Sequence, residues 1–220
     1  MAAAAPESAD VTGARKLPTA EELSEALKVD VYDREGKTKT LGELVKGCLN
    51  CQAYVRCISE SIPPSNLPSN TQILIIGCGS YQPIDTYAAN SSSKYPIYTD
   101  PSLRLHKLFQ FKSNLAEGKA GDEQRDYMRN AGSTMSRIFG GIKGALGNLQ
   151  HVNSVGPKAL NGGEVVLSAD GECEYMYRMQ NTVDHTNISE LAKLIGAEYT
   201  PVEGEQKTAQ TCDNPAVEAK

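Results

Sequence analysis

Cys48-Leu49-Asn50-Cys51, followed at once by Gln52-Ala53-Tyr54-Val55, is the stretch on which the predicted fold depends. Two cysteines at this spacing can close a small disulfide ring. The residues after Cys51 follow a helical pattern in which Tyr54, Val55 and Ile58 face a core. The free N–H groups and the dipole at the start of a helix stabilise a thiolate on the first sulfur. The stretch therefore predicts a reactive dithiol at the beginning of a helix.

The segments on either side alternate between helices and strands. The apolar run 73–76 has the strongest strand pattern, and its lack of polar residues indicates a strand covered on both faces. Asp100 and Pro101 are expected to be the N-cap and first residue of the next helix. The other expected elements are helices at 19–27, 40–47, 50–60, 81–90 and 188–195, strands at 29–31, 37–39 and 95–99, and a hairpin at 164–179 that turns at Asp170-Gly171.

This order of elements predicts one α/β domain. Strands alternate with helices first, and an antiparallel hairpin and a closing helix follow, which is the plan of a thioredoxin-like three-layer sandwich with a mixed central sheet. A Cys-x-x-Cys near a βαβ pattern is typical of redox proteins with that fold. The expected boundaries are a disordered tail over residues 1–18, the domain over 19–198 and a second disordered tail over 199–220.

Composition and charge argue against several kinds of partner. A net charge of -5 and a pI of 5.3 do not suit a nucleic-acid or anionic membrane surface, and a chain without Trp and with 3 Phe lacks a stacking platform for single strands. No apolar run reaches the ~20 residues that a membrane span needs. The first residues have neither a secretory nor a mitochondrial pattern, and 6 Cys are too sparse for a disulfide framework. We therefore expect a cytoplasmic protein.

A set of motifs extends over roughly residues 20–197. The set consists of Val31-Tyr-Asp-Arg-Glu-Gly-Lys37, Cys-x-x-Cys-Gln-x-Tyr-Val at 48–55, Ile75-Ile-Gly-Cys-Gly79, Tyr95-Pro-Ile-Tyr-Thr-Asp-Pro101, the Gly162-Gly-Glu start of the hairpin and Arg178-Met-Gln-Asn-Thr-x-Asp-His185. Together and in this order, the motifs resemble the peroxiredoxin-like branch of the AhpC/TSA antioxidant proteins, and fungal members most of all.

The resemblance implies thiol-based reduction of a peroxide or a disulfide. Cys48 is expected to attack as the catalytic thiolate, Cys51 to resolve the product, and an external thiol reductant to restore the pair. No metal or organic cofactor is implied, and no nucleic-acid or membrane partner.

Two features depart from the family pattern. Typical peroxiredoxins carry Pro-x-x-x-Thr/Ser-x-x before the attacking cysteine, and neither Cys48 nor Cys51 follows such a pattern, a departure that this branch shares. Family members also have an apolar strand immediately before the Cys-x-x-Cys, whereas here residues 41–47 run straight into Cys48. Either the strand at 29–31 moves inward, or the sheet is smaller, or the chain is a truncated gene model or splice form. The predicted sheet therefore has one central strand in question.

Other interpretations of the candidate residues stay open at this point. Cys48 and Cys51 could be reduced structural thiols or half of a zinc site, and the domain could be a catalytically silent binding module. Cys57, Cys78 and Cys173 are expected to serve packing or a tight turn, and Cys212 to lie free in the tail. Arg178 and His185 could steady a thiolate or a substrate anion, but a solvated arginine and a neighbour of a helix cap are preferred.

Overall fold

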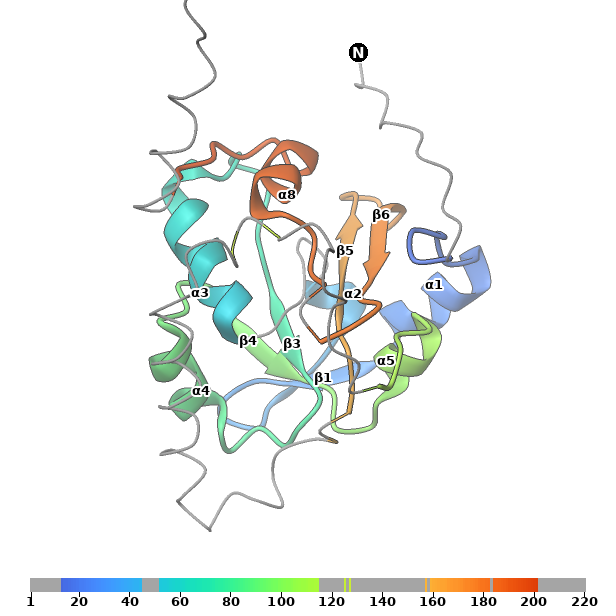
Figure 1. Ribbon diagram of the computed structural model, residues 1–220. Coiled ribbons are helices and arrows are strands. Elements are labelled where there is room, and N and C mark those ends of the chain that lie inside the picture. The colour runs from blue at the N-terminus through green and yellow to red at the C-terminus, as the bar shows by residue number, and fades with distance from the viewer. Residues whose placement is uncertain are drawn as a thin grey trace, which may run out of the picture.

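The computed structural model describes residues 13–44, 52–114, 125, 127, 157, 159–182 and 184–201. The helices and strands in this part of the chain are shown in Figure 1. In chain order they are α1 (Ala20–Leu27), β1 (Asp30–Tyr32), β2 (Thr38–Thr40), α2 (Leu41–Leu44), α3 (Gln52–Ser61), a 3₁₀ turn η1 (Pro64–Asn66), β3 (Ile75–Gly77), α4 (Ile84–Ser91), β4 (Ile97–Thr99), α5 (Arg104–Leu108), β5 (Gly163–Leu167), β6 (Cys173–Arg178) and α8 (Ile188–Leu194).

The strands form a mixed sheet and a separate hairpin. The sheet has the order β2-β1-β4-β3, with β1 antiparallel to both of its neighbours and β3 parallel to β4. The hairpin pairs β5 with β6, with an irregularity between Val166 and Leu167. Both the early parallel pair and the late antiparallel hairpin agree with the order predicted from the sequence.

Alternate strand residues contribute to two separate apolar layers. Ile73, Ile75 and Val166 belong to a core cluster with α3, α4 and α8. Leu74 and Val165 belong to a second cluster with α1, α2 and α5. Because neighbouring side chains of a strand point to opposite faces, this division places one set of helices on each side of the strands. In Figure 1, α3 and α4 accordingly lie on one side and α1 and α5 on the other, which confirms the predicted three-layer α/β arrangement.

The four-stranded sheet and the hairpin contribute to the same two core clusters. Figure 1 shows the hairpin on the side of β3 away from β4, and β3 and β5 contribute to both core clusters. Ile75 N–H donates to Pro96 at the β4 side, so its neighbours Leu74 and Ile76 direct their backbone groups to the other edge. Among the residues that the structure describes, no strand joins that edge of β3 to the hairpin.

Local hydrogen bonds explain where the first elements begin and turn. Thr19 and Glu22 form a complete capping box at the start of α1, and Thr40 and Glu43 repeat that exchange at α2. Gly171 has φ +83 in the turn of the hairpin, a conformation that suits glycine. These signals were readable in the sequence, and the predicted helix, hairpin and turns are confirmed.

The prediction for the start of α5 was wrong. The helix begins at Arg104, after Leu103 with φ 58, and Pro101 lies before it in a turn. Asp100 is buried, and its carboxylate accepts from Ser102 N–H at 3.0 Å and from Leu105 N–H at 2.8 Å. The carboxylate thus stabilises a turn before the helix in addition to the first helical turn, which displaces the helix start.

The chain is packed from its first described residues. Ala14 is 4% exposed and belongs to the larger core cluster. Its carbonyl accepts from the backbone N–H of Arg178 at 2.9 Å, so the segment 13–16 lies along β6. The predicted tail over residues 1–18 therefore includes a segment that makes core contacts. The outer limits of the domain stay a prediction.

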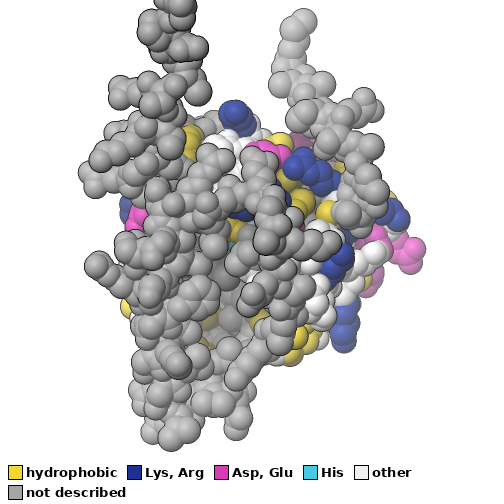
Figure 2. All heavy atoms as spheres, viewed as in Figure 1, with side chains coloured by type: hydrophobic (Ala, Val, Ile, Leu, Met, Phe, Trp, Pro, Cys, Tyr) yellow, Lys and Arg dark blue, Asp and Glu magenta, His cyan; other side chains and the backbone are white. Residues whose placement is uncertain are grey.

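The surface carries both signs of charge. Figure 2 shows Lys and Arg side chains interspersed with Asp and Glu on the part of this face that carries described residues. Of the helices in the described ranges, none is both long and apolar enough to span a bilayer.

Candidate functional site

The predicted catalytic cysteines lie just before a described helix. Cys48 and Cys51 are outside the described residues, and α3 begins at the next residue, Gln52. The structure therefore leaves their roles untested. It does show what fixes the helix that follows them.

Helix α3 is held by its buried face. Tyr54 and Val55 are 0% exposed and Ile58 is 3% exposed, as the helical spacing predicted. Fully burying an apolar side chain of this size contributes roughly 1.5–3 kcal/mol to stability. At the other end of the helix, the Tyr95 hydroxyl donates to the carbonyl of Ile62. Tyr54 and Val55 are thus among the most buried side chains of the described chain.

Three aromatic rings meet at this first turn. The Tyr54 and His185 rings are stacked, with centroids 4.3 Å apart and planes 6° apart. The Tyr127 ring stands edge-on to both, at 5.1 Å from Tyr54 and 5.8 Å from His185. The Tyr127 hydroxyl also accepts from the backbone N–H of His185 at 3.0 Å. Residues far apart in the sequence therefore enclose the start of α3.

A buried carboxylate holds His185 in place. Glu164 is 0% exposed, and one of its oxygens, Oε1, lies 2.8 Å from His185 Nδ1. The other oxygen, Oε2, lies 2.8 Å from Thr186 Oγ1 and accepts from Thr186 N–H at 3.3 Å. The Tyr175 hydroxyl lies 2.9 Å from Thr186 Oγ1 and extends the network into β6. Glu164, on β5, is thereby connected to the loop that leads into α8.

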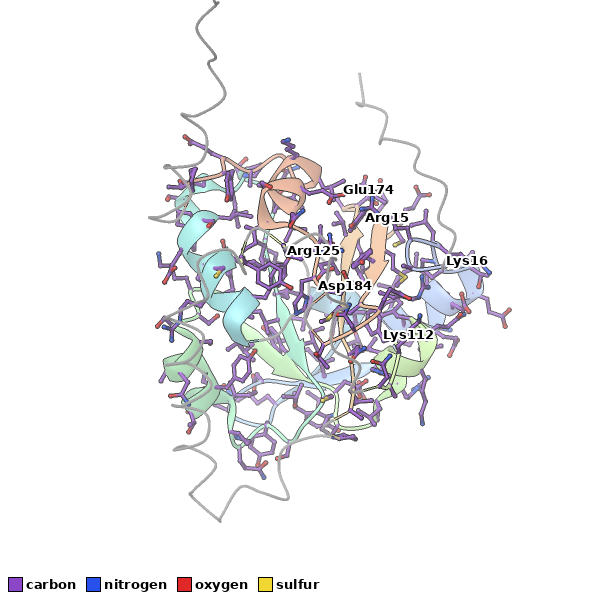
Figure 3. All side chains as sticks on the ribbon, viewed as in Figure 1. Arg15, Lys16, Lys112, Arg125, Glu174 and Asp184 are labelled. Carbon is purple, nitrogen blue, oxygen red and sulfur yellow. The ribbon has the colours of Figure 1, made fainter. Side chains whose placement is uncertain are left out.

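A second polar group lies beside the first. Arg125 forms an ion pair with Asp184 and donates to the Tyr177 hydroxyl at 3.0 Å, and the Tyr177 hydroxyl donates to Asp184 at 2.6 Å. Figure 3 shows Arg125 and Asp184 close together. Burial, followed by the hydrogen bond to Asp184, raises the pKa of Tyr177, so its hydroxyl stays protonated and can donate.

The other described cysteines do not form a second dithiol. Cys57, Cys78 and Cys173 are free thiols. Burial raises the pKa of Cys78, and it raises that of Cys173 to about 11, so neither thiol is activated for attack at neutral pH. The expected packing roles of Cys57 and Cys173 agree with their contacts to the two core clusters. Within the described residues, no group of three or more His, Cys, Asp or Glu side chains could hold a metal ion.

The interpretation of Arg178 was wrong, and His185 has a buried partner that was not predicted from the sequence. Arg178 is 5% exposed rather than solvated, and donates to the carbonyls of Phe109, Gly13 and Lys16. His185 is 2% exposed and is bonded to Glu164, which sequence analysis did not single out. The available signal was a carboxylate in a strand that is otherwise apolar, because a charge there requires a buried partner.

The chain is similar in sequence to known proteins. The family model described as AhpC/TSA antioxidant enzyme matches residues 59–181, which begin after Cys51. Peroxiredoxin-like 2C of Homo sapiens is 24% identical over 220 residues, covering 90% of this chain and 95% of the relative. Peroxiredoxin-like 2C of Bos taurus is 23% identical over 185 residues, covering 78% of each chain.

A solved structure gives a weaker likeness. A crystal structure of a proposed electron transfer protein from Aquifex aeolicus VF5 aligns with a TM-score of 0.41 and 12% identity. The alignment covers 77% of this chain and 88% of that one. The mammalian relatives leave the fungal resemblance a prediction. The mixed sheet, the helices on its two faces and the matched family model agree on a thioredoxin-like α/β fold. The chain belongs to the AhpC/TSA antioxidant enzyme family, among its peroxiredoxin-like members.

Proposed function

We propose that this protein is a thiol-dependent oxidoreductase that reduces a peroxide or a disulfide through Cys48 and Cys51. Its family membership supports thiol redox chemistry. The observation that carries the assignment to this pair is the helix that starts at Gln52, directly after Cys51, and that buries Tyr54 and Val55 completely. A fixed helix start offers N–H groups that stabilise a thiolate.

The chemistry needs only the two thiols and an external reductant. The Cys48 thiolate attacks one peroxide oxygen; the O–O bond breaks, the other oxygen leaves as an alkoxide or hydroxide that takes a proton, and Cys48 becomes a sulfenic acid. The Cys51 thiolate then attacks the Cys48 sulfur, forming the disulfide and expelling hydroxide, which takes a proton to become water. Two external thiols reduce the disulfide and leave as their own disulfide. With a disulfide as substrate, the first product is a mixed disulfide instead.

Intact-mass measurement tests this proposal. After a mild peroxide pulse, the wild-type chain should lose two hydrogen atoms, and peptide mapping should place the bond between Cys48 and Cys51. Cys48→Ser should not form this bond. Cys57→Ser is the matched control because Cys57 lies on the same helix and should leave the bond intact. A folded wild-type protein that forms no disulfide at this pair would contradict the proposal.

A further inference from the structure

We propose that Glu164 and His185 act as a positioning pair for the redox helix, by fixing the ring of Tyr54 in its first turn. This inference rests on the proposed function of Cys48 and Cys51. Glu164 and His185 are buried in the described part of the chain, and the thiol chemistry does not itself use them. Neither residue is placed in contact with a substrate, so their effect would be transmitted through α3.

Three polar groups contact the buried carboxylate of Glu164. His185 Nδ1 lies 2.8 Å from Oε1, while the Thr186 N–H and hydroxyl both reach Oε2. The carboxylate oxygens hold all three of these contacts, and the contact at Nδ1 fixes the orientation of the imidazole ring. With side chains 0% and 3% exposed, neither Glu164 nor His185 can exchange these bonds for water.

The imidazole in turn holds Tyr54. The two rings lie nearly parallel at a centroid distance of 4.3 Å, and Tyr54 stands three positions after Cys51 in the sequence. Rotating the imidazole would break either its bond to Glu164 or its stack on Tyr54. The pair therefore determines where the Tyr54 side chain, and with it the backbone of the first helical turn, can sit.

Charged and titratable groups on the neighbouring elements frame the pair. Tyr54 faces it from α3, Tyr127 faces His185 edge-on, and Tyr175 of β6 reaches it through Thr186. Asp184, which precedes His185, forms an ion pair with Arg125. Core packing alone does not explain this polar pair, because apolar residues of similar volume are often as stable as a buried ion pair or more so. A requirement for one fixed ring orientation does explain it.

Two measurements on Glu164→Gln test the proposal. Replacing this buried carboxylate by an amide should speed hydrogen exchange at the backbone amides of residues 54–56 by roughly ten- to a hundredfold. It should also raise the pKa of Cys48, read from the ultraviolet absorbance of the thiolate, toward the ordinary value of about 8.5, since a displaced helix start no longer stabilises the anion. The raised pKa values of Cys78 and Cys173 keep those thiols out of this titration.

Matched variants separate positioning from general destabilisation. Glu174→Gln changes an exposed carboxylate of the same hairpin and should leave both measurements unchanged. Thr186→Val removes the hydroxyl that contacts both Glu164 and Tyr175 but keeps the other bonds of Glu164, so it should shift both measurements in the same direction by less and serves if Glu164→Gln does not fold. Tyr54→Leu should reproduce the effect of Glu164→Gln.

The outcomes distinguish this inference from the proposed function. If the wild type forms the Cys48–Cys51 disulfide but Glu164→Gln and Thr186→Val behave like Glu174→Gln, the positioning role is overturned and the function stands. If the wild type forms no disulfide, the function fails, and unchanged exchange in α3 would then overturn the positioning role separately.

Discussion

Several polar and charged side chains of this protein are buried beside partners that lie far away in the sequence. The apolar positions Tyr54, Val55 and Ile58 were predicted because helical periodicity depends on neighbours in the sequence. Glu164 and His185 meet across 21 positions, and Arg178 meets Gly13 across 165. No local pattern encodes such partners, so the redox motif of the site could be predicted, whereas its buried polar surroundings could not.

Arg178 gives a prediction at this scale. Its guanidinium donates to Phe109 at 2.6 Å, to Lys16 at 2.5 Å and to Gly13 at 3.2 Å, and so joins β6, α5 and the N-terminal segment. Arg178→Lys keeps the charge but cannot reach three separate carbonyls. Unfolding in urea should show a loss of about 1–3 kcal/mol, the cost of leaving buried acceptors without donors.

The control for this change is Arg104→Lys. Arg104 has a side chain 53% exposed and pairs with Glu25 at 3.6 Å on the surface. Exchanging it should alter stability by little, since exposed ion pairs contribute about 0–1 kcal/mol. Equal effects of the two substitutions would show that the buried carbonyl contacts of Arg178 do not stabilise the fold.

Helices that begin with a capping box were predicted well, whereas α5, predicted from a single cap residue, starts later than expected. The capping boxes at Thr19 and Thr40 lie within four residues of sequence, which is why the starts of α1 and α2 were readable. At α5, Asp100 carries the same composition signal but bonds to Ser102 as well as Leu105, and the helix starts later. A cap residue therefore predicts a nearby turn or helix, but it does not determine whether the helix begins at once or only after a turn.

The contact between α3 and β4 has a pH dependence that can be measured. Burial raises the pKa of Tyr95 from 10.0 to about 12, and its hydroxyl donates to Ile62. A raised folded-state pKa means that the unfolded chain loses this proton first as the pH rises. The resulting stability is complete below pH 10 and declines between about pH 10 and 12.

Tyr95→Phe should therefore be less stable than the wild type below pH 10, because the Ile62 carbonyl loses its donor. The difference should shrink as the pH approaches 12, which thermal unfolding followed across this range would show. Tyr32→Phe is the control, since Tyr32 is only partly buried in β1. A difference between wild type and Tyr95→Phe that stays constant with pH would contradict the assigned burial effect.

At the scale of the whole molecule, the described strands form two separate sheets. The absence of an apolar strand before Cys48 suggested a smaller sheet or an incomplete chain. The described strands form four- and two-stranded sheets that share both core clusters and are not joined by a described strand. The sequence could predict the number of layers from its order of elements. How the remaining strands adapt depends on long-range packing, which no single segment encodes.

Inserting a strand tests whether the separation of the two sheets lowers the stability of the fold. A segment of about six residues, Val- and Ile-rich as in a buried strand, placed between Gly47 and Cys48 should raise the thermal midpoint. Each new ladder hydrogen bond contributes about 0.5–1.5 kcal/mol, and the apolar side chains would extend both core clusters. A Gly/Ser insertion of equal length is the matched control and should lower the midpoint, because it adds chain entropy without adding apolar contacts. If both insertions lower it equally, the sheet is complete as it stands, and the shorter chain is a stable variant of the fold rather than one lacking a strand.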